Sequence, residues 1–205
     1  QGYGLTETAP IVALNPVFHY KEASVGKLIP RVSAKILEPD EDGRGEIAVK
    51  GPNVMLGYFE DEEATAEIMM DDGYLKTGDV GYLDHENYLY LTGRQKSLIV
   101  TEGGKNVYPE EIEDKFQLFD EIEQILVKGF VLDKAMKTEG IEAYIYPAEE
   151  FSKEKDPAEV EKRLQEIINQ VNRDMLPYQR IARLKVLDEP LEMTTTRKIK
   201  RFKVD

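Results

Sequence analysis

Residues 72–109 read DGYLKTGDVGYLDHENYLYLTGRQKSLIVTEGGKNVYP, and this stretch decides the fold. Thr77-Gly78-Asp79 predicts a Gly-flanked turn that holds a carboxylate, and Asp84–Asn87 predicts the loop of a β-hairpin. Further on, Gly103-Gly104 predicts the end of a strand, and Tyr108-Pro109 predicts a helix start with proline at its first position. The stretch therefore predicts a passage from a β-rich section to a section that contains helices.

The residues before this passage predict a mostly β section. Apolar and polar residues alternate between Arg31 and Ile36, which is typical of a half-buried strand. The expected strands are 31–36, 46–50, 74–75, 82–83 and 88–91, with a short helix at 61–70. Together they predict a small distorted β-barrel or curved sheet over a first domain at residues 1–93.

After residue 94 the pattern changes to that of a small α+β domain. The expected strands are 96–101, 122–131, 141–146 and 182–186, and helices are expected to begin at Tyr108 and Asp156. The second helix has the clearer signal, an apolar stripe made by Val160, Leu164, Ile167, Ile168, Val171 and Met175. The order β, α, β, β, α, β predicts an α+β class, with a second domain at 94–205.

The composition limits the kind of protein. The 205 residues are 41% apolar and 33% charged, with a formal net charge of −13, two histidines and no cysteine. This acidic balance argues against a broad nucleic-acid surface, which must be electropositive, and the absence of cysteine excludes thiolate metal sites. We expect a cytoplasmic protein, with histidines on its surface and at most peripheral membrane contact, because no run of about 18 apolar residues and no signal peptide is evident.

Four residues have side chains suited to a nucleotide. The Tyr3 ring lies between two glycines and can lie flat against a base, the Thr6 hydroxyl can donate to a phosphate oxygen, and the Glu7 carboxylate can hold Mg²⁺. A plain loop is the alternative for this segment. Asp79 can accept two hydrogen bonds from a ribose diol, and the alternative is an aspartate that only satisfies its own turn.

Three basic segments stand out against the acidic background. Arg94 and Lys96 lie two residues apart at the expected start of a strand, where solvated charges are usual. Gly103-Gly104-Lys105 lacks the spacing of a phosphate-binding P-loop, and its glycines let a thin ligand pass close to the backbone. Thr194–Lys198 brings hydroxyls and a cation near the chain end. A disordered basic tail is the alternative, although such a tail is expected to find an anion on its own acidic molecule.

Taken in order, these motifs resemble the adenylate-forming superfamily, which includes acyl-CoA synthetases, adenylation domains of peptide synthetases and luciferases. The matching segments are GYGLTE at 2–7, GEI at 45–47 with GPNVMLGY at 51–58, YLKTGD at 74–79, GRQK at 93–96, GGKNVYPEEIE at 103–113 and TTTRKIKR at 194–201. Segments 53–58 and 103–109 look most like long-chain fatty acid CoA ligases. The chain departs from the pattern at Arg197, where many members have Gly, and at Lys96, where many have Asp.

The resemblance implies roles for the residues of the first motifs. Gly2 and Tyr3 would bind adenine, Thr6 the α-phosphate, Glu7 the Mg²⁺ ion, and Asp79 and Arg94 the ribose hydroxyls. Thr6 and Glu7 would also act in catalysis, because the phosphate and the metal take part in the first step.

The resemblance also implies roles for the C-terminal domain. Lys198 would bridge the substrate carboxylate and the α-phosphate while pyrophosphate leaves, which stabilises the charge that develops there. Lys96 would be the hinge about which the domain rotates between two half-reactions. Gly103, Gly104 and Lys105 would then line the channel for CoA.

The implied reaction is that of an ATP-dependent acid–thiol ligase of lipid metabolism. A fatty acid and ATP would form an acyl-adenylate, which CoA would convert to acyl-CoA, with Mg²⁺ required. The chain does not begin with Met and lacks the family's phosphate-binding loop, so we expect a fragment that is inactive alone. Two alternatives stay open: an adenylation domain that loads a carrier protein, and a non-catalytic interaction module.

Overall fold

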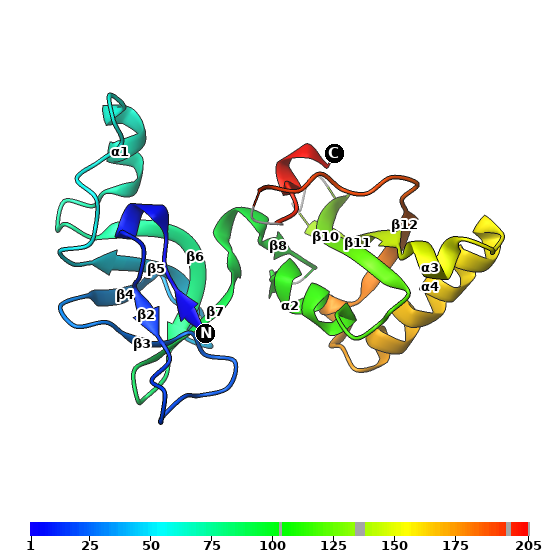
Figure 1. Cartoon of the computed structure of the whole chain (residues 1–205), viewed down its shortest axis with the longest axis horizontal. Coiled ribbons are helices and arrows are strands. Elements are labelled where there is room, and N and C mark those ends of the chain that lie inside the picture. Colours follow the sequence, from blue (N-terminus) through cyan, green and yellow to red (C-terminus); the bar gives the residue numbers. More distant parts are fainter. Residues whose placement is uncertain (103, 134–137, 196–197, 205) are drawn as a thin grey trace. The chain divides into compact units, whose positions relative to one another are not determined.

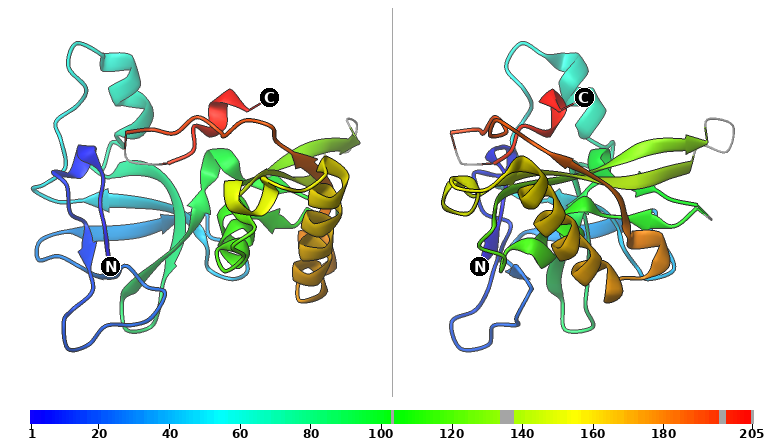
Figure 2. Two further views of the ribbon diagram at one scale, coloured as in Figure 1. Left: turned by 45° about the vertical axis from the view of Figure 1, so that its right-hand side comes forward. Right: turned by 90° about the vertical axis from the view of Figure 1, so that its right-hand side faces the viewer.

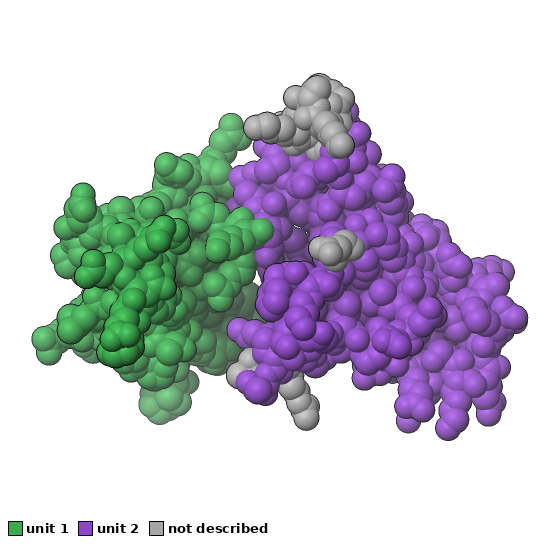
Figure 3. Space-filling model, turned by 90° about the horizontal axis from the view of Figure 1, so that it is seen from above, with its two compact units in different colours: residues 1–96 green, residues 97–205 purple. Residues whose placement is uncertain are grey.

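The structure is a computed structural model that describes residues 1–102, 104–133, 138–195 and 198–204. The chain divides into two compact units, unit 1 at Gln1–Lys96 and unit 2 at Ser97–Asp205 (Figure 3). Each unit has its own hydrophobic core. No helix among the described residues is both long enough and apolar enough to cross a membrane.

Unit 1 is built on one antiparallel sheet of seven strands in the order β1-β2-β3-β7-β6-β5-β4 (Figure 1). The strands are β1 (Gly2–Tyr3), β2 (Ala13–Leu14), β3 (Gly26–Leu28), β4 (Ser33–Leu37), β5 (Gly45–Lys50), β6 (Leu75–Leu83) and β7 (Tyr88–Arg94). The unit also holds the 3₁₀ turn η1 (Thr6–Thr8) and helix α1 (Glu62–Ile68). The sheet is open, with β1 and β4 as its two edges in the fully described unit, so of the two predicted forms, a barrel or a curved sheet, no closed barrel is present.

Strand β6 differs most from its prediction. Leu75–Leu83 is one nine-residue strand, where the sequence predicted two short strands joined by a turn. On the neighbouring strand, Glu46 pairs with Val80 and Ala48 with Lys76, so the residues between form a bulge. Gly78 lies in this bulge with φ of 69°, a conformation that glycine adopts without steric cost. The Thr-Gly-Asp motif is therefore a bulge within a strand and not a turn.

The hairpin between β6 and β7 follows its prediction. The Asp84 carboxylate accepts hydrogen bonds from the backbone N–H groups of Glu86 and Tyr88, both at 2.9 Å. Asn87 takes a positive φ of 64°, which asparagine tolerates better than most residues. The predicted loop at 84–87 is confirmed, because the aspartate and asparagine satisfy the turn locally.

Unit 2 is a three-stranded sheet covered by helices, in the order β10-β11-β12 (Figure 2). Strands β10 (Ile122–Asp133) and β11 (Thr138–Pro147) are antiparallel, and β12 (Ile181–Val186) joins β11 in parallel. The other elements are the short ladder of β8 (Ile99–Val100) and β9 (Asn106–Val107), the helices α2 (Pro109–Glu113), α3 (Glu149–Ser152) and α4 (Pro157–Arg173), and the 3₁₀ turns η3 (Asp114–Phe116), η4 (Pro177–Gln179) and η5 (Arg201–Lys203). The α+β class and the β, α, β, β, α, β order are confirmed.

Helix α4 forms where its pattern predicts it. The Asp156 side chain caps the first turn by accepting from the Ala158 N–H at 2.8 Å, and Pro157 occupies the first helical position. The predicted stripe is buried along its whole length and packs with β11 and α2 in the core of unit 2. The helix ends at Arg173, four residues before Pro177.

Two segments of the second half differ from their predictions. Gln95–Ser97 forms a 3₁₀ turn, η2, and the strand that follows is only Ile99–Val100, so the predicted strand 96–101 was too long. The C-terminal segment forms a small antiparallel pairing, with Met193 opposite Ile199. Lys200, Arg201 and Lys203 of this segment contact acidic residues of unit 2, as the acidic background predicts.

Candidate functional site

Three residues from distant parts of unit 1 meet at one carboxylate. The Tyr3 hydroxyl donates to Asp79 Oδ2 at 2.6 Å, and Arg94 Nε lies 2.7 Å from Asp79 Oδ1. Asp79 and Arg94 are direct cross-strand partners on β6 and β7, while Tyr3 comes from β1. The structure thus brings together three of the residues that the sequence analysis singled out for a nucleotide.

Local structure directs Asp79 toward its partners. In the bulge, the Thr77 hydroxyl donates to the Ile47 carbonyl at 2.7 Å and accepts from the Asp79 N–H at 3.1 Å. The Gly78 N–H donates to Glu46 Oε1 at 3.0 Å. These contacts replace the sheet hydrogen bonds that a bulge loses. Thr77 and Glu46 therefore hold the motif in shape, a role that only the pairing with β5 reveals.

The cluster differs in exposure from one member to the next. Tyr3 is 9% exposed and belongs to the core of unit 1, and the Asp79 side chain is 11% exposed. The Arg94 side chain is 53% exposed, so its guanidinium reaches the surface. Burial raises the pKa of the Tyr3 phenol, and the neighbouring Asp79 carboxylate raises it further. The phenol therefore stays protonated and remains a hydrogen-bond donor at neutral pH.

The backbone between Tyr3 and Glu7 is held by close packing. A Cβ at Gly4 would lie 1.6 Å from the Pro10 carbonyl oxygen, so only glycine fits at this crossing. The buried Thr8 hydroxyl accepts from the Leu5 N–H at 3.0 Å and closes the η1 turn. Thr8 was not singled out from the sequence, because its contacts lie within a turn that no periodic pattern predicts.

The first two residues of η1 are Thr6 and Glu7. Thr6 is exposed, while Glu7 Oε1 accepts from the Tyr58 hydroxyl at 2.9 Å. The Glu7 carbonyl accepts from the Met55 N–H at 2.8 Å, which fixes its backbone. The hydrogen bond to Glu7 is the main cause that raises the pKa of Tyr58. The tyrosine of the GPNVMLGY segment therefore positions the carboxylate of the first motif.

The donors present can be compared with the needs of Mg²⁺. Among the described residues, no group of three or more histidine, aspartate or glutamate side chains could hold a metal ion. Mg²⁺ is commonly bound by one or two carboxylates together with waters and substrate phosphates. Glu7 has one carboxylate oxygen, Oε2, that is not used by Tyr58. A single carboxylate of this kind fits a magnesium ion that a nucleotide brings with it.

Unit 2 holds the other predicted site residues. Lys198 is exposed, and its ammonium group makes no hydrogen bond or ion pair with the described part of the chain. Gly104 has a φ of 71°, and Lys105 is exposed with its carbonyl bound to the Thr101 N–H at 3.0 Å. Gly103 and Arg197, the residue at which the sequence departs from the family pattern, lie outside the described residues. Lys96 is exposed in η2 and is the last residue of unit 1.

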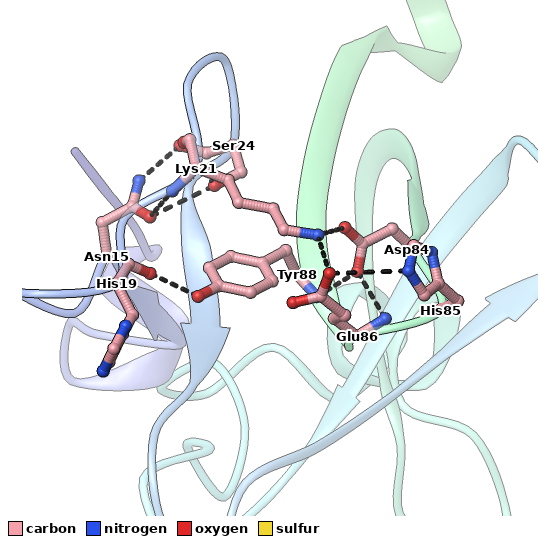
Figure 4. A network of polar contacts seen from close by, with 8 residues as sticks. All are labelled: Asn15, His19, Lys21, Ser24, Asp84, His85, Glu86 and Tyr88. Carbon is pink, nitrogen blue, oxygen red and sulfur yellow. Dashed lines mark hydrogen bonds and ion pairs between the residues drawn. The ribbon is translucent and has the colours of Figure 1, made fainter.

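A second polar network joins the loop after β2 to the β6–β7 hairpin (Figure 4). Lys21 Nζ lies 2.6 Å from Asp84 Oδ2 and 2.9 Å from Glu86 Oε1, and the Tyr88 hydroxyl donates to the His19 carbonyl. The hydrogen bonds that Lys21 donates to Asp84 and Glu86 raise the pKa of its ammonium group. This network has a structural role, because it closes a loop over a hairpin. Both histidines of the chain are exposed, as expected.

Comparison with known proteins gives matches to both sequence and fold. Residues 1–59 match the family model described as AMP-binding enzyme. A long-chain-fatty-acid–CoA ligase of Escherichia coli is 41% identical over 135 residues, which are 63% of this chain and 24% of that protein. A probable 4-coumarate–CoA ligase of Dictyostelium discoideum is 44% identical over 119 residues, which are 55% and 21%. The chain thus spans about a quarter of the length of these relatives.

Solved structures match nearly the whole chain. O-succinylbenzoate CoA synthetase (MenE) from Bacillus subtilis in complex with its acyl-adenylate intermediate has a TM-score of 0.79 and 32% identity, covering 99% of this chain and 40% of that chain. The same enzyme in complex with ATP and magnesium has a TM-score of 0.76 and 33% identity, again covering 99% and 40%. The family model, the curated relatives and the solved structures agree: the chain is similar in sequence to AMP-binding enzymes and CoA ligases, and its fold matches that of a CoA synthetase that forms an acyl-adenylate.

Proposed function

We propose that this chain is part of an ATP-dependent acyl-CoA ligase that acts on long-chain fatty acids. The observation that supports this most is the meeting of Tyr3, Asp79 and Arg94, which stand at the nucleotide motifs of the family and are up to 91 residues apart. The reaction would join a fatty acid to AMP with loss of pyrophosphate. CoA thiol would then displace AMP and give acyl-CoA.

The buried cluster suits a ribose. A carboxylate has about four lone-pair positions, and Tyr3 and Arg94 use two of those on Asp79. The remaining positions can accept the two hydroxyls of a ribose diol, with the exposed Arg94 guanidinium beside them. The hydrogen bond from Tyr3 to Asp79 fixes the orientation of the Tyr3 ring. We assign adenine binding to this ring and to Gly2.

The η1 turn suits the phosphates. The exposed Thr6 hydroxyl can donate to the α-phosphate, and Glu7, held by Tyr58, can bind Mg²⁺ that accompanies ATP. When bound, the ion would neutralise charge on the phosphates and assist the departure of pyrophosphate. Glu7 and Thr6 would then position the reacting phosphate.

The second unit would supply the cation for adenylation. We assign this role to Lys198, because its ammonium is exposed and bound to no described residue, so it is free to meet an anion. Lys96, at the end of unit 1, would be the hinge between adenylation and thioester formation. The loop of Gly103, Gly104 and Lys105 would line the CoA channel in the second state.

The test uses the full-length protein that contains this chain. We expect exchange of pyrophosphate into ATP that depends on a long-chain fatty acid, and formation of acyl-CoA when CoA is added. Lys198→Ala should lower the exchange rate roughly 10²- to 10³-fold, since it removes a group that stabilises developing charge. Lys203→Ala, which removes an exposed cation of the same tail, is the matched control and should keep the wild-type rate.

Other outcomes separate the alternatives. Because one relative is a probable 4-coumarate–CoA ligase of Dictyostelium discoideum, 4-coumarate is tested as a competing substrate. Preference for 4-coumarate over a long-chain fatty acid would reject the proposed acid class. Transfer to a carrier protein and not to CoA would reject the ligase. Unchanged exchange in Lys198→Ala would favour an interaction module. We expect no exchange from the 205-residue chain alone, and robust turnover by it would refute that part of the proposal.

A further inference from the structure

The described residues on either side of positions 196–197 pair with one another, and we call these paired residues, 192–195 and 198–200, the hairpin. Met193 pairs with Ile199, the Thr194 N–H donates to the Lys198 carbonyl at 2.7 Å, and the Lys198 N–H donates to the Thr194 hydroxyl at 3.1 Å. The Lys200 N–H donates to the Glu192 carbonyl at 2.8 Å. These contacts define the local shape of the hairpin, but they do not determine where it lies on unit 2.

The outer edge of strand β10 holds one side of the hairpin. β10 is an edge strand in the described sheet, so alternate backbone groups point away from β11 and need partners. The Val127 N–H donates to Glu113 Oε1 at 2.6 Å, and the Val127 carbonyl accepts from the Arg201 guanidinium at 3.1 Å. Both outward groups of a single edge residue are therefore satisfied, one from α2 and one from the tail.

The same guanidinium binds the carboxylate that pairs with Val127. Arg201 donates to Glu113 Oε2 and lies 3.5 Å from Glu110 Oε1. The Glu113 side chain is 16% exposed and that of Arg201 is 30% exposed, so water screens this contact less than the other contacts of the tail. Arg201 thus joins three elements, the tail, α2 and β10, only three residues after Lys198.

The other side of the hairpin is held on the same strand. The buried Gln124 side chain accepts from the Leu191 N–H at 2.6 Å. Gln124 and Val127 are three residues apart on β10. The residue before the hairpin, Leu191, and the residue after it, Arg201, are therefore both bound to the same strand. By contrast, Lys200 and Lys203 bind the exposed Glu192 side chain, and exposed ion pairs of this kind contribute little to order.

We propose that Arg201 is a positioning residue for adenylation: held by Glu113 and the Val127 edge of β10, it orients the hairpin that presents Lys198. The inference rests on the proposed function, in which Lys198 acts in adenylation and not in thioester formation. The planar guanidinium contacts a carbonyl and a carboxylate at once, which a lysine ammonium does not reproduce with the same geometry. Arg201 acts through Lys198 and need not touch the substrate.

The first experiment needs no catalytic activity. Amide hydrogen exchange is measured by mass spectrometry on the 205-residue chain, as wild type, Arg201→Ala and the control Lys203→Ala. Loss of the Arg201 contacts to Glu113 and to the Val127 carbonyl should speed exchange in peptides covering 191–204 by roughly 10- to 100-fold, while peptides from α4 and β11 keep their rates. Lys203→Ala should leave both regions unchanged. Unchanged exchange at 191–204 in Arg201→Ala would overturn the inference.

The second experiment compares the two half-reactions in the full-length protein. Arg201→Ala should lower the adenylation rate at saturating substrates by roughly 10- to 100-fold, with KM for ATP unchanged, because a displaced reacting group costs rate. CoA consumption from supplied acyl-adenylate should stay at the wild-type rate, which shows that unit 2 remains folded. Arg201→Lys should not restore adenylation. An equal fall of both half-reactions would overturn the positioning role.

The two experiments fail in different ways. If the wild-type full-length protein forms no acyl-adenylate, the proposed function is rejected, and hydrogen exchange alone still decides whether Arg201 orders the hairpin. If the wild type is active and Arg201→Ala adenylates at the normal rate, the proposed function stands and the positioning role is rejected.

Discussion

Replacing Tyr3 with phenylalanine tests the buried cluster most directly, because it removes one oxygen atom and keeps the ring. The lost interaction is the 2.6 Å hydrogen bond to Asp79 Oδ2. The Asp79 side chain is 11% exposed, so water cannot fully replace the missing donor. Arg94 still neutralises the carboxylate, which limits the cost of leaving one of its oxygens unpaired.

The magnitude follows from these contacts. A hydrogen bond to a charged group contributes about 1.5–3 kcal/mol, and we expect Tyr3→Phe to destabilise unit 1 by about 2 kcal/mol. Asp79→Asn keeps the shape of the side chain but removes its charge and turns an amide N–H₂ toward Tyr3 or Arg94. We expect a similar or larger loss from this second variant. The double variant should lose about 1–2 kcal/mol less stability than the sum of the two single losses, because both single changes break the same hydrogen bond between Tyr3 and Asp79.

Amide hydrogen exchange in the 205-residue chain is the assay. The slowest amides of β6 and β7 report the opening of unit 1, and those of α4 in unit 2 are an internal control. A loss of about 2 kcal/mol corresponds to exchange about 30-fold faster in unit 1. If Tyr3→Phe changes this rate less than about twofold, or if the two changes add within about 0.5 kcal/mol, the cluster does not stabilise unit 1 as reasoned.

Three further predictions concern stability. Burial raises the pKa of Glu113 to about 7 despite the nearby Arg201 guanidinium, so folding takes up a proton between the unfolded pKa near 4.5 and pH 7. The stability of unit 2 should therefore fall as pH rises from 5 to 7, by at most on the order of 3 kcal/mol, and Glu113→Gln should abolish this trend in urea unfolding. Gly81→Ala would place a Cβ 2.1 Å from a carbonyl oxygen of β7 and should destabilise unit 1 by about 1–3 kcal/mol in thermal unfolding; an unchanged midpoint would contradict this. Leu164→Ala opens a cavity in the core of unit 2 and should cost about 2–5 kcal/mol, whereas Leu118→Ala, at a side chain that is 91% exposed, should cost little; equal losses would refute the packing described.

Local patterns in the sequence predict several elements because their physics is local. The cap at Asp156, the proline that follows and a stripe at helical spacing predict α4, and its buried face agrees with them. The hairpin at 84–87 follows for the same reason, since its aspartate and asparagine satisfy the turn within a few residues. The motifs also identify the residues of the candidate nucleotide site, although no pattern places them in contact.

Only the tertiary structure decides the contacts between distant segments. The sequence of the Thr-Gly-Asp motif is typical of a turn, but its pairing register with β5 makes it a bulge. This bulge directs Asp79 to Tyr3, which is 76 residues away in the sequence. The anchor of Arg201 on Glu113 spans 88 residues and depends on which edge of β10 the tail crosses. Sequence by itself determined which side chains are available and which local elements form. Strand register and edge exposure, which depend on all strands pairing at once, decided which of those side chains meet.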